Sequence, residues 1–192
     1  AAPQPAQAYD CLLDTSRNGG GAPDGLASDG DDTDGGATST TVQTLACGYL
    51  ASAPDIGDTA LGVNTDTYGT YATAVGDGAQ AGTLGQTYIG ATAIGAGANA
   101  SHRKSTAVGS VALASGAGSI AIGSEGDDGA SPLGATATGS DSIAIGTDSL
   151  AAANCATAVG RRSDASGLNS VAVGSFSSAL GSVDIALGAS AS

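Results

Sequence analysis

The sequence predicts an all-β protein, a parallel β-roll or solenoid of 14-residue coils, and three observations support this prediction. A triplet of Ala, an aliphatic residue or Cys, and Gly recurs along most of the chain. Residues before each of these glycines alternate with period two, which is the pattern of a β-strand. Ala, Gly, Ser and Thr together make up more than half of the chain, and side chains this small favour a thin repetitive structure over a wide core.

The repeat is marked by its glycine. The ten repeat glycines are Gly48, Gly62, Gly76, Gly95, Gly109, Gly123, Gly146, Gly160, Gly174 and Gly188. Seven of the nine differences between successive positions equal 14, and the other two are 19 and 23. These two larger differences predict loop insertions of five residues around 83–90 and of nine residues around 125–134. We therefore expect residues 41–192 to form one continuous stack, after a Gly-rich and Asp-rich lead-in or cap over residues 1–40.

Each copy predicts two short strands of about five residues. In the first strand, the aliphatic residue directly before the glycine and the residue two places earlier share one face, and the Ala between them takes the other face. The second strand carries small residues three and five places after the glycine, such as Ala79 and Ala81. We expect the aliphatic residues to point inward and the row of alanines to form a smooth outer face. Successive coils then pair in parallel at about 4.8 Å.

A stack this thin predicts self-association. Its interior holds only a few small side chains per coil, so one chain buries too little apolar surface to offset the entropy of ordering its backbone. A second burial surface is needed, and the row of alanines would allow close approach of another chain. The sequence therefore predicts a symmetric homo-oligomer.

Charge and composition exclude several classes of function. Five basic residues against 18 acidic ones, with a net charge of −13, argue against nucleic acid as a partner. No apolar run is long enough to cross a bilayer as a helix. We find no catalytic triad, no pair of catalytic carboxylates, no phosphate-binding loop and no zinc-ligand spacing. The sequence thus predicts a protein that is not an enzyme and that needs no cofactor or metal.

Two copies of the repeat carry a family resemblance. The segments 169–179 (NSVAVGSFSSA) and 142–151 (SIAIGTDSLA) resemble the head repeat of trimeric autotransporter adhesins of the Yersinia adhesin (YadA-like) type. This resemblance implies a left-handed parallel β-roll assembled as a homotrimer. It also implies an exported protein on the cell surface, at the outer membrane of a Gram-negative bacterium, attached to the membrane only through a C-terminal anchor that this sequence does not include.

The resemblance further implies a function in adhesion. Family members bind host extracellular-matrix proteins or cell-surface receptors, and the family signature maps onto Asn169, Ser170 and Val171. Two basic pairs in expected turns, Arg103 with Lys104 and Arg161 with Arg162, are further candidates for ligand binding because they offer positive charge to an acidic partner. Thr replaces the Val of the signature in several copies, and its Asn is usually missing.

The three cysteines allow one disulfide. In an exported protein, Cys11 and Cys47 are able to pair, and the bond would hold the lead-in over the open end of the stack. We expect Cys47 to occupy an inward aliphatic position of the first coil. If it does not pair with Cys11, it would be a small buried residue with a free thiol there. Cys155 lies in an expected turn without an obvious partner.

Two other functions remain open alternatives. Short segments after Ile94 and Val108 resemble the hexapeptide pattern of left-handed β-helix acyltransferases, in which His102 would be the base. Coils of those enzymes follow a longer repeat, built from three hexapeptides, which a 14-residue repeat does not fit. An ice-binding β-solenoid would need an unbroken row of Thr on one face, whereas Thr alternates here with Val and Ile.

Overall fold

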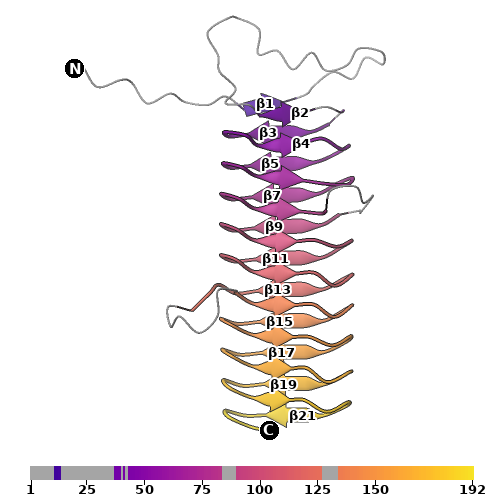
Figure 1. Cartoon of the computed structure of the whole chain (residues 1–192), viewed down its shortest axis with the longest axis vertical. Helices are drawn as coiled ribbons and strands as arrows, with labels where there is room; N and C mark the ends of the chain where they lie inside the picture. The colour runs from indigo at the N-terminus through magenta and orange to yellow at the C-terminus, as the bar shows by residue number, and fades with distance from the viewer. Residues whose placement is uncertain (1–10, 14–36, 40, 42, 84–89, 127–133) are drawn as a thin grey trace, which may run out of the picture.

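The protein is a stack of flat coils along one axis, as Figure 1 shows. The computed structural model describes residues 11–13, 37–39, 41, 43–83, 90–126 and 134–192. Each coil contributes one three-residue strand and one two-residue strand, and the two kinds of strand form two separate sheets of 11 and 10 strands. The predicted all-β parallel solenoid with 14-residue coils is confirmed, although its strands are shorter than expected.

The two sheets follow the odd-numbered and the even-numbered strands. The first sheet contains β1 (Cys11–Leu13), β3 (Leu45–Cys47), β5 (Thr59–Leu61), β7 (Thr73–Val75), β9 (Thr92–Ile94), β11 (Thr106–Val108), β13 (Ile120–Ile122), β15 (Ile143–Ile145), β17 (Thr157–Val159), β19 (Val171–Val173) and β21 (Ile185–Leu187). The second contains β2 (Thr38–Ser39), β4 (Ser52–Ala53), β6 (Asp66–Thr67), β8 (Gln80–Ala81), β10 (Asn99–Ala100), β12 (Leu113–Ala114), β14 (Thr136–Ala137), β16 (Leu150–Ala151), β18 (Asp164–Ala165) and β20 (Ser178–Ala179). From β2 and β3 onward, every described pairing within a sheet is parallel.

Equivalent residues of successive coils lie directly beside each other. Ala158 pairs with Ala172, its counterpart in the next coil. The register survives both insertions, because Ala74 pairs with Ala93 and Ala121 with Ala144. The insertions therefore interrupt turns and leave the scaffold unchanged, as the spacing of the glycines predicts. Residues 84–89 and 127–133 of these insertions lie outside the described part of the chain.

Alanine lines the interior. Our expectation for the first strand, with the aliphatic residues pointing inward and the alanines outward, is therefore wrong. The alanines of both sheets, such as Ala144 and Ala151, are fully buried between the sheets. Aliphatic residues such as Ile145 point outward, and Ile145 is 38% exposed. The physical reason is thickness: the two sheets of so flat a coil lie too close together for side chains larger than Ala, Ser or Thr, apart from one Asp among the described residues.

Stacking of the turns explains why each copy keeps its glycine. Gly146 has a φ of 132°, and a Cβ added there would lie 2.6 Å from the carbonyl oxygen of Gly160 in the next coil. Any side chain at this position would separate adjacent coils. A buried serine closes the opposite turn in several coils; the Ser142 hydroxyl, for example, donates to the Gly139 carbonyl at 2.7 Å.

The N-terminal end of the first sheet differs from the rest. Strand β1 pairs with β3 in the antiparallel direction and places Cys11 opposite Cys47. Cys47 is half-buried on the outer face, so the expected inward position is wrong, and it is disulfide-bonded. Cys155 is an exposed free thiol. Since β2 (Thr38–Ser39) already pairs with β4, the second sheet begins at residue 38. The division of the chain at residue 40 remains a prediction.

Candidate interaction surfaces

The first sheet has an apolar outer surface that runs the length of the stack. Each coil contributes the first and third residues of its strand, which flank the buried Ala. We call this surface the aliphatic face, and it consists of Leu45, Cys47, Thr59, Leu61, Thr73, Val75, Thr92, Ile94, Thr106, Val108, Ile120, Ile122, Ile143, Ile145, Thr157, Val159, Val171, Val173, Ile185 and Leu187. A contiguous exposed apolar surface of this kind marks an interaction site in soluble proteins.

The second sheet has a mostly polar outer surface. We call it the polar face, and it consists of Ser52, Asp66, Gln80, Asn99, Leu113, Leu150, Asp164 and Ser178. Its side chains bond to one another: the Asn99 amide donates to Gln80 Oε1 at 3.1 Å, between adjacent coils. Asn99 Oδ1 is buried and accepts no hydrogen bond, but most of the side chains on this face are polar and remain hydrated without a protein partner.

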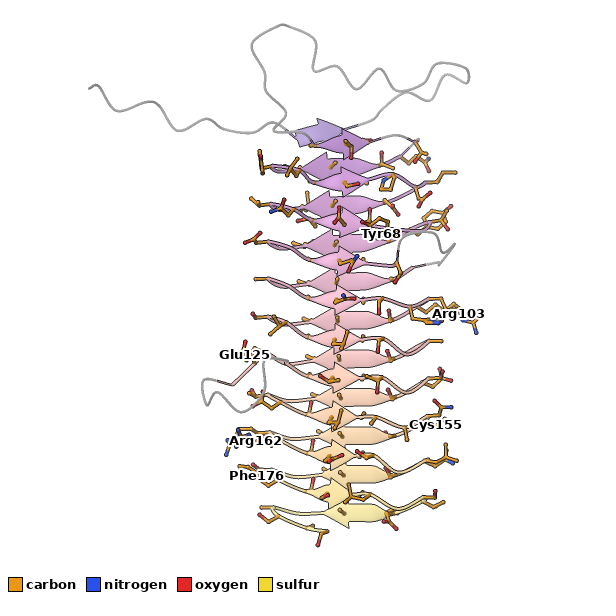
Figure 2. All side chains as sticks on the ribbon, in the orientation of Figure 1. Tyr68, Arg103, Glu125, Cys155, Arg162 and Phe176 are labelled. Carbon is orange, nitrogen blue, oxygen red and sulfur yellow. The ribbon has the colours of Figure 1, made fainter. Side chains whose placement is uncertain are left out.

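The two basic pairs lie on opposite edges of the roll, as the labels of Arg103 and Arg162 in Figure 2 show. Arg103 and Lys104 are exposed in the turn between β10 and β11. The Arg103 backbone N–H donates to Nδ1 of His102 at 2.9 Å. Arg161 and Arg162 follow β17 in a turn of the other kind. The structure therefore separates residues that the sequence offered as one group of candidates.

Arg161 and Arg162 lie in a cluster with Phe176 and Asp148. The guanidinium carbons of Arg161 and Arg162 are 4.5 and 5.8 Å from the centre of the Phe176 ring. Arg162 Nε lies 3.6 Å from Asp148 Oδ2. The backbone N–H of Gly126, beside the second insertion, donates to Asp148 Oδ1 at 3.1 Å. Phe176 and Asp148 were not among the residues predicted from the sequence, although the 14-residue period aligns Asp148, Arg162 and Phe176 in successive coils.

The three residues of the family signature have three different surroundings. Asn169 is exposed at a turn position with a φ of 55°, a left-handed conformation that Asn tolerates better than most residues. Ser170 is fully buried in the interior, and Val171 lies on the aliphatic face. Only Asn169 of this group is freely accessible on an edge. This placement gives Ser170 and Val171 clear structural roles within the repeat.

One ionisable group lies inside the stack, and the sequence analysis did not identify it. Asp58 is fully buried at a repeat position where most other coils carry Ser or Ala. Its carboxylate accepts hydrogen bonds from the Ala72 N–H at 2.9 Å and the Thr67 hydroxyl at 2.9 Å. Burial raises the pKa of Asp58 from 3.8 to about 6, while these hydrogen bonds lower it. Burial also raises the pKa of Asp66, on the adjacent outer surface.

The described part of the chain holds neither a metal-binding cluster nor a membrane-spanning helix. No group of three or more His, Cys, Asp or Glu side chains there is arranged to hold a metal ion. Within the same residues, no helix has the length and apolar character needed to cross a membrane. The chemistry that the described residues do offer lies on the outer faces and edges of the roll.

These features define a solenoid repeat protein, with one apolar and one polar outer face on an alanine interior. The family described as YadA head domain repeat (2 copies) matches residues 56–79, 89–112, 103–125, 137–163 and 165–191, which is more than half of the chain. The chain therefore belongs to the YadA head repeat family, and the resemblance stated from its sequence is confirmed. The family suggests an adhesin. A comparison with curated proteins finds no match.

Proposed function

We propose that this chain is the head of a bacterial surface adhesin, a rigid homotrimer that binds host extracellular-matrix proteins or cell-surface receptors and catalyses no reaction. The observation that carries this proposal is the aliphatic face, which continues over all ten coils and which no other part of the chain that the structure describes covers. Membership of the YadA head family supports a trimer of left-handed rolls at the outer membrane of a Gram-negative bacterium.

The repeat itself argues for identical partners. An apolar surface that repeats at every coil is best covered by a surface with the same spacing and the same pattern of side chains. A second copy of this chain has both properties. Symmetric association then buries the aliphatic face of each copy, whereas the polar face and the edges stay in solvent. From the sequence, we expected the row of alanines to be the surface that another chain covers. The aliphatic residues lie on the outside instead, so they form the surface that we propose for this contact.

The cysteines fit export to an oxidising compartment. Cys47 is disulfide-bonded, and the antiparallel pairing of β1 places Cys11 opposite it. We propose that these two residues form the bond. Structural disulfides of this kind persist in exported proteins and are rare in the cytosol.

An adhesion assay tests the proposed function. The whole chain is applied to immobilised collagen, fibronectin, laminin and vitronectin, and to cultured host cells, beside an Ile122→Asp/Ile145→Asp variant designed to be monomeric. We expect the parent to bind at least one of these targets and the variant to bind at least tenfold more weakly, because a trimer presents three copies of each contact. Absence of parent binding to every target would overturn the proposed function.

A further inference from the structure

We propose that the edge formed by Arg161, Arg162 and Phe176 binds a short acidic sugar chain through a sulfate or carboxylate group. We call these three residues the basic edge. The inference deepens the proposed adhesin function by naming a ligand class for one place on the rod. It stands on an arrangement of side chains that no other described turn repeats.

The position two residues after the repeat glycine has a left-handed backbone in most coils. Asp148, Arg162 and Phe176 have φ values of 55°, 55° and 60° there. Gly78 and Gly97 occupy this position in two earlier coils, and other coils carry Leu50, Asn64, Val111 and Ser190. The backbone conformation therefore belongs to the repeat, and the contacts of Arg162 with Asp148 and with the Phe176 ring distinguish these three coils.

The cluster holds the two arginines differently. The Asp148 side chain is 6% exposed and lies beside Arg162, so it balances the charge of Arg162 and fixes its position. Arg161 has no acidic partner among the residues that the structure describes, and its guanidinium lies over the Phe176 ring. Stacking orients this guanidinium without neutralising it. Arg161 thus presents a positioned positive charge to solvent.

This chemistry suits an acidic sugar. A guanidinium stacked on a ring still offers its N–H groups in one plane, where a carboxylate or sulfate accepts two of them. Phe176 is 43% exposed and provides an apolar surface for the C–H face of a sugar ring. The net charge of −13 opposes a long polyanion, which favours a short chain bearing few acidic groups. One site per chain becomes three in a trimer.

The experiment compares the binding of three tetrasaccharides and the effect of substitutions on the two opposite edges of the roll. Surface plasmon resonance of the immobilised whole chain uses three tetrasaccharides: one from heparin, one from hyaluronan and neutral chitotetraose. We expect one or both acidic sugars to bind, and Arg161→Gln and Phe176→Ser each to weaken that binding at least fivefold. Arg103→Gln/Lys104→Gln removes two charges from the opposite edge and should change binding less than twofold. Both acidic sugars carry carboxylates, so binding of the heparin tetrasaccharide alone would assign recognition to sulfate, whereas binding of the hyaluronan tetrasaccharide would show that a carboxylate is sufficient.

Four outcomes would overturn the inference. They are absence of binding by both acidic sugars, equal binding of chitotetraose, unchanged binding by Arg161→Gln, and an equal loss in the Arg103→Gln/Lys104→Gln control, which would indicate unspecific charge attraction. Light scattering and circular dichroism on each variant separate these outcomes from misfolding. A trimer that adheres to matrix proteins and binds no acidic sugar leaves the proposed function standing and removes this inference alone.

Discussion

The two sheets of the roll share one interior and differ in their outer surfaces. Ala144 in β15 and Ala151 in β16 face each other's sheet and are both fully buried. Outside them, β15 carries Ile143 and Ile145, whereas the second sheet carries residues such as Gln80 and Asp164. Since both sheets satisfy the same packing requirement inside, the difference outside reflects what each surface meets. This difference supports the proposed assembly, in which one surface would meet copies of the chain and the other would meet solvent.

The largest effect is expected from a charge placed on the aliphatic face. Ile145→Asp would bury a carboxylate in each copy at the interface, which costs several kcal/mol per charge, and we expect the trimer to dissociate at micromolar concentration. Leu150→Asp, on the polar face of the next strand, is the matched control and should leave the trimer intact. Light scattering measures both masses. Equal behaviour of the two variants would remove the distinction between the faces.

Removal of the disulfide tests the N-terminal end of the aliphatic face. If Cys11 and Cys47 are bonded, Cys47→Ser releases the loop between them and lowers the free energy of unfolding by about 3–4 kcal/mol. Urea unfolding of the parent, with and without reductant, measures the same difference. Reductant should leave Cys47→Ser unchanged. A parent that is insensitive to reductant would contradict the pairing.

Asp58 tests the common interior. Its pKa is about 6 in the folded protein and 3.8 in the unfolded chain, so the unfolded state ionises first as pH rises. Stability is therefore lost between pH 4 and pH 6, by about 3 kcal/mol. Unfolding of Asp58→Asn between pH 4 and pH 7 should lack this loss. Asp184→Asn, at the same repeat position but exposed, is the control, and an identical pH profile for parent and Asp58→Asn would contradict the assignment.

The smallest effect concerns the turns that join the two faces. Val183 has a φ of 65° and is 69% exposed, which is a strained conformation for a β-branched residue with little burial to offset it. Asn169 occupies the same position one coil earlier. We expect Val183→Asn to raise stability by about 1 kcal/mol. A lower thermal midpoint for this variant would show that Val183 contributes contacts of its own.

Most of the scaffold was predictable from the glycines. Their spacing gave the coil length, the ten copies and the position of both insertions, because the close contact between Gly146 and Gly160 requires glycine in every coil. The direction of the strands' side chains was not given by alternation, since period two defines two faces without saying which is inside. Side-chain size decides this: residues as large as Ile145 do not fit between sheets that meet through alanine methyl groups.

The candidate site was predictable only in part. Arg161 and Arg162 were identified as basic turn residues, but their support by Phe176 depends on side-chain conformations in neighbouring coils. Asp58 was missed because an acidic residue at a repeat position that also holds Ser, Ala and Thr looks like part of a solvated turn until the fold shows it to be buried. In both cases the 14-residue alignment shows which residues are neighbours in successive coils. Their burial and side-chain contacts depend on local packing, which the alignment does not show.

The central claim is that the aliphatic face is buried between three copies of the chain. Sedimentation equilibrium of the unmodified protein at micromolar concentration tests it most directly. We expect a single species with three times the mass of the 17.8 kDa chain. A stable, folded species of 17.8 kDa would leave the aliphatic face in water and would contradict the claim.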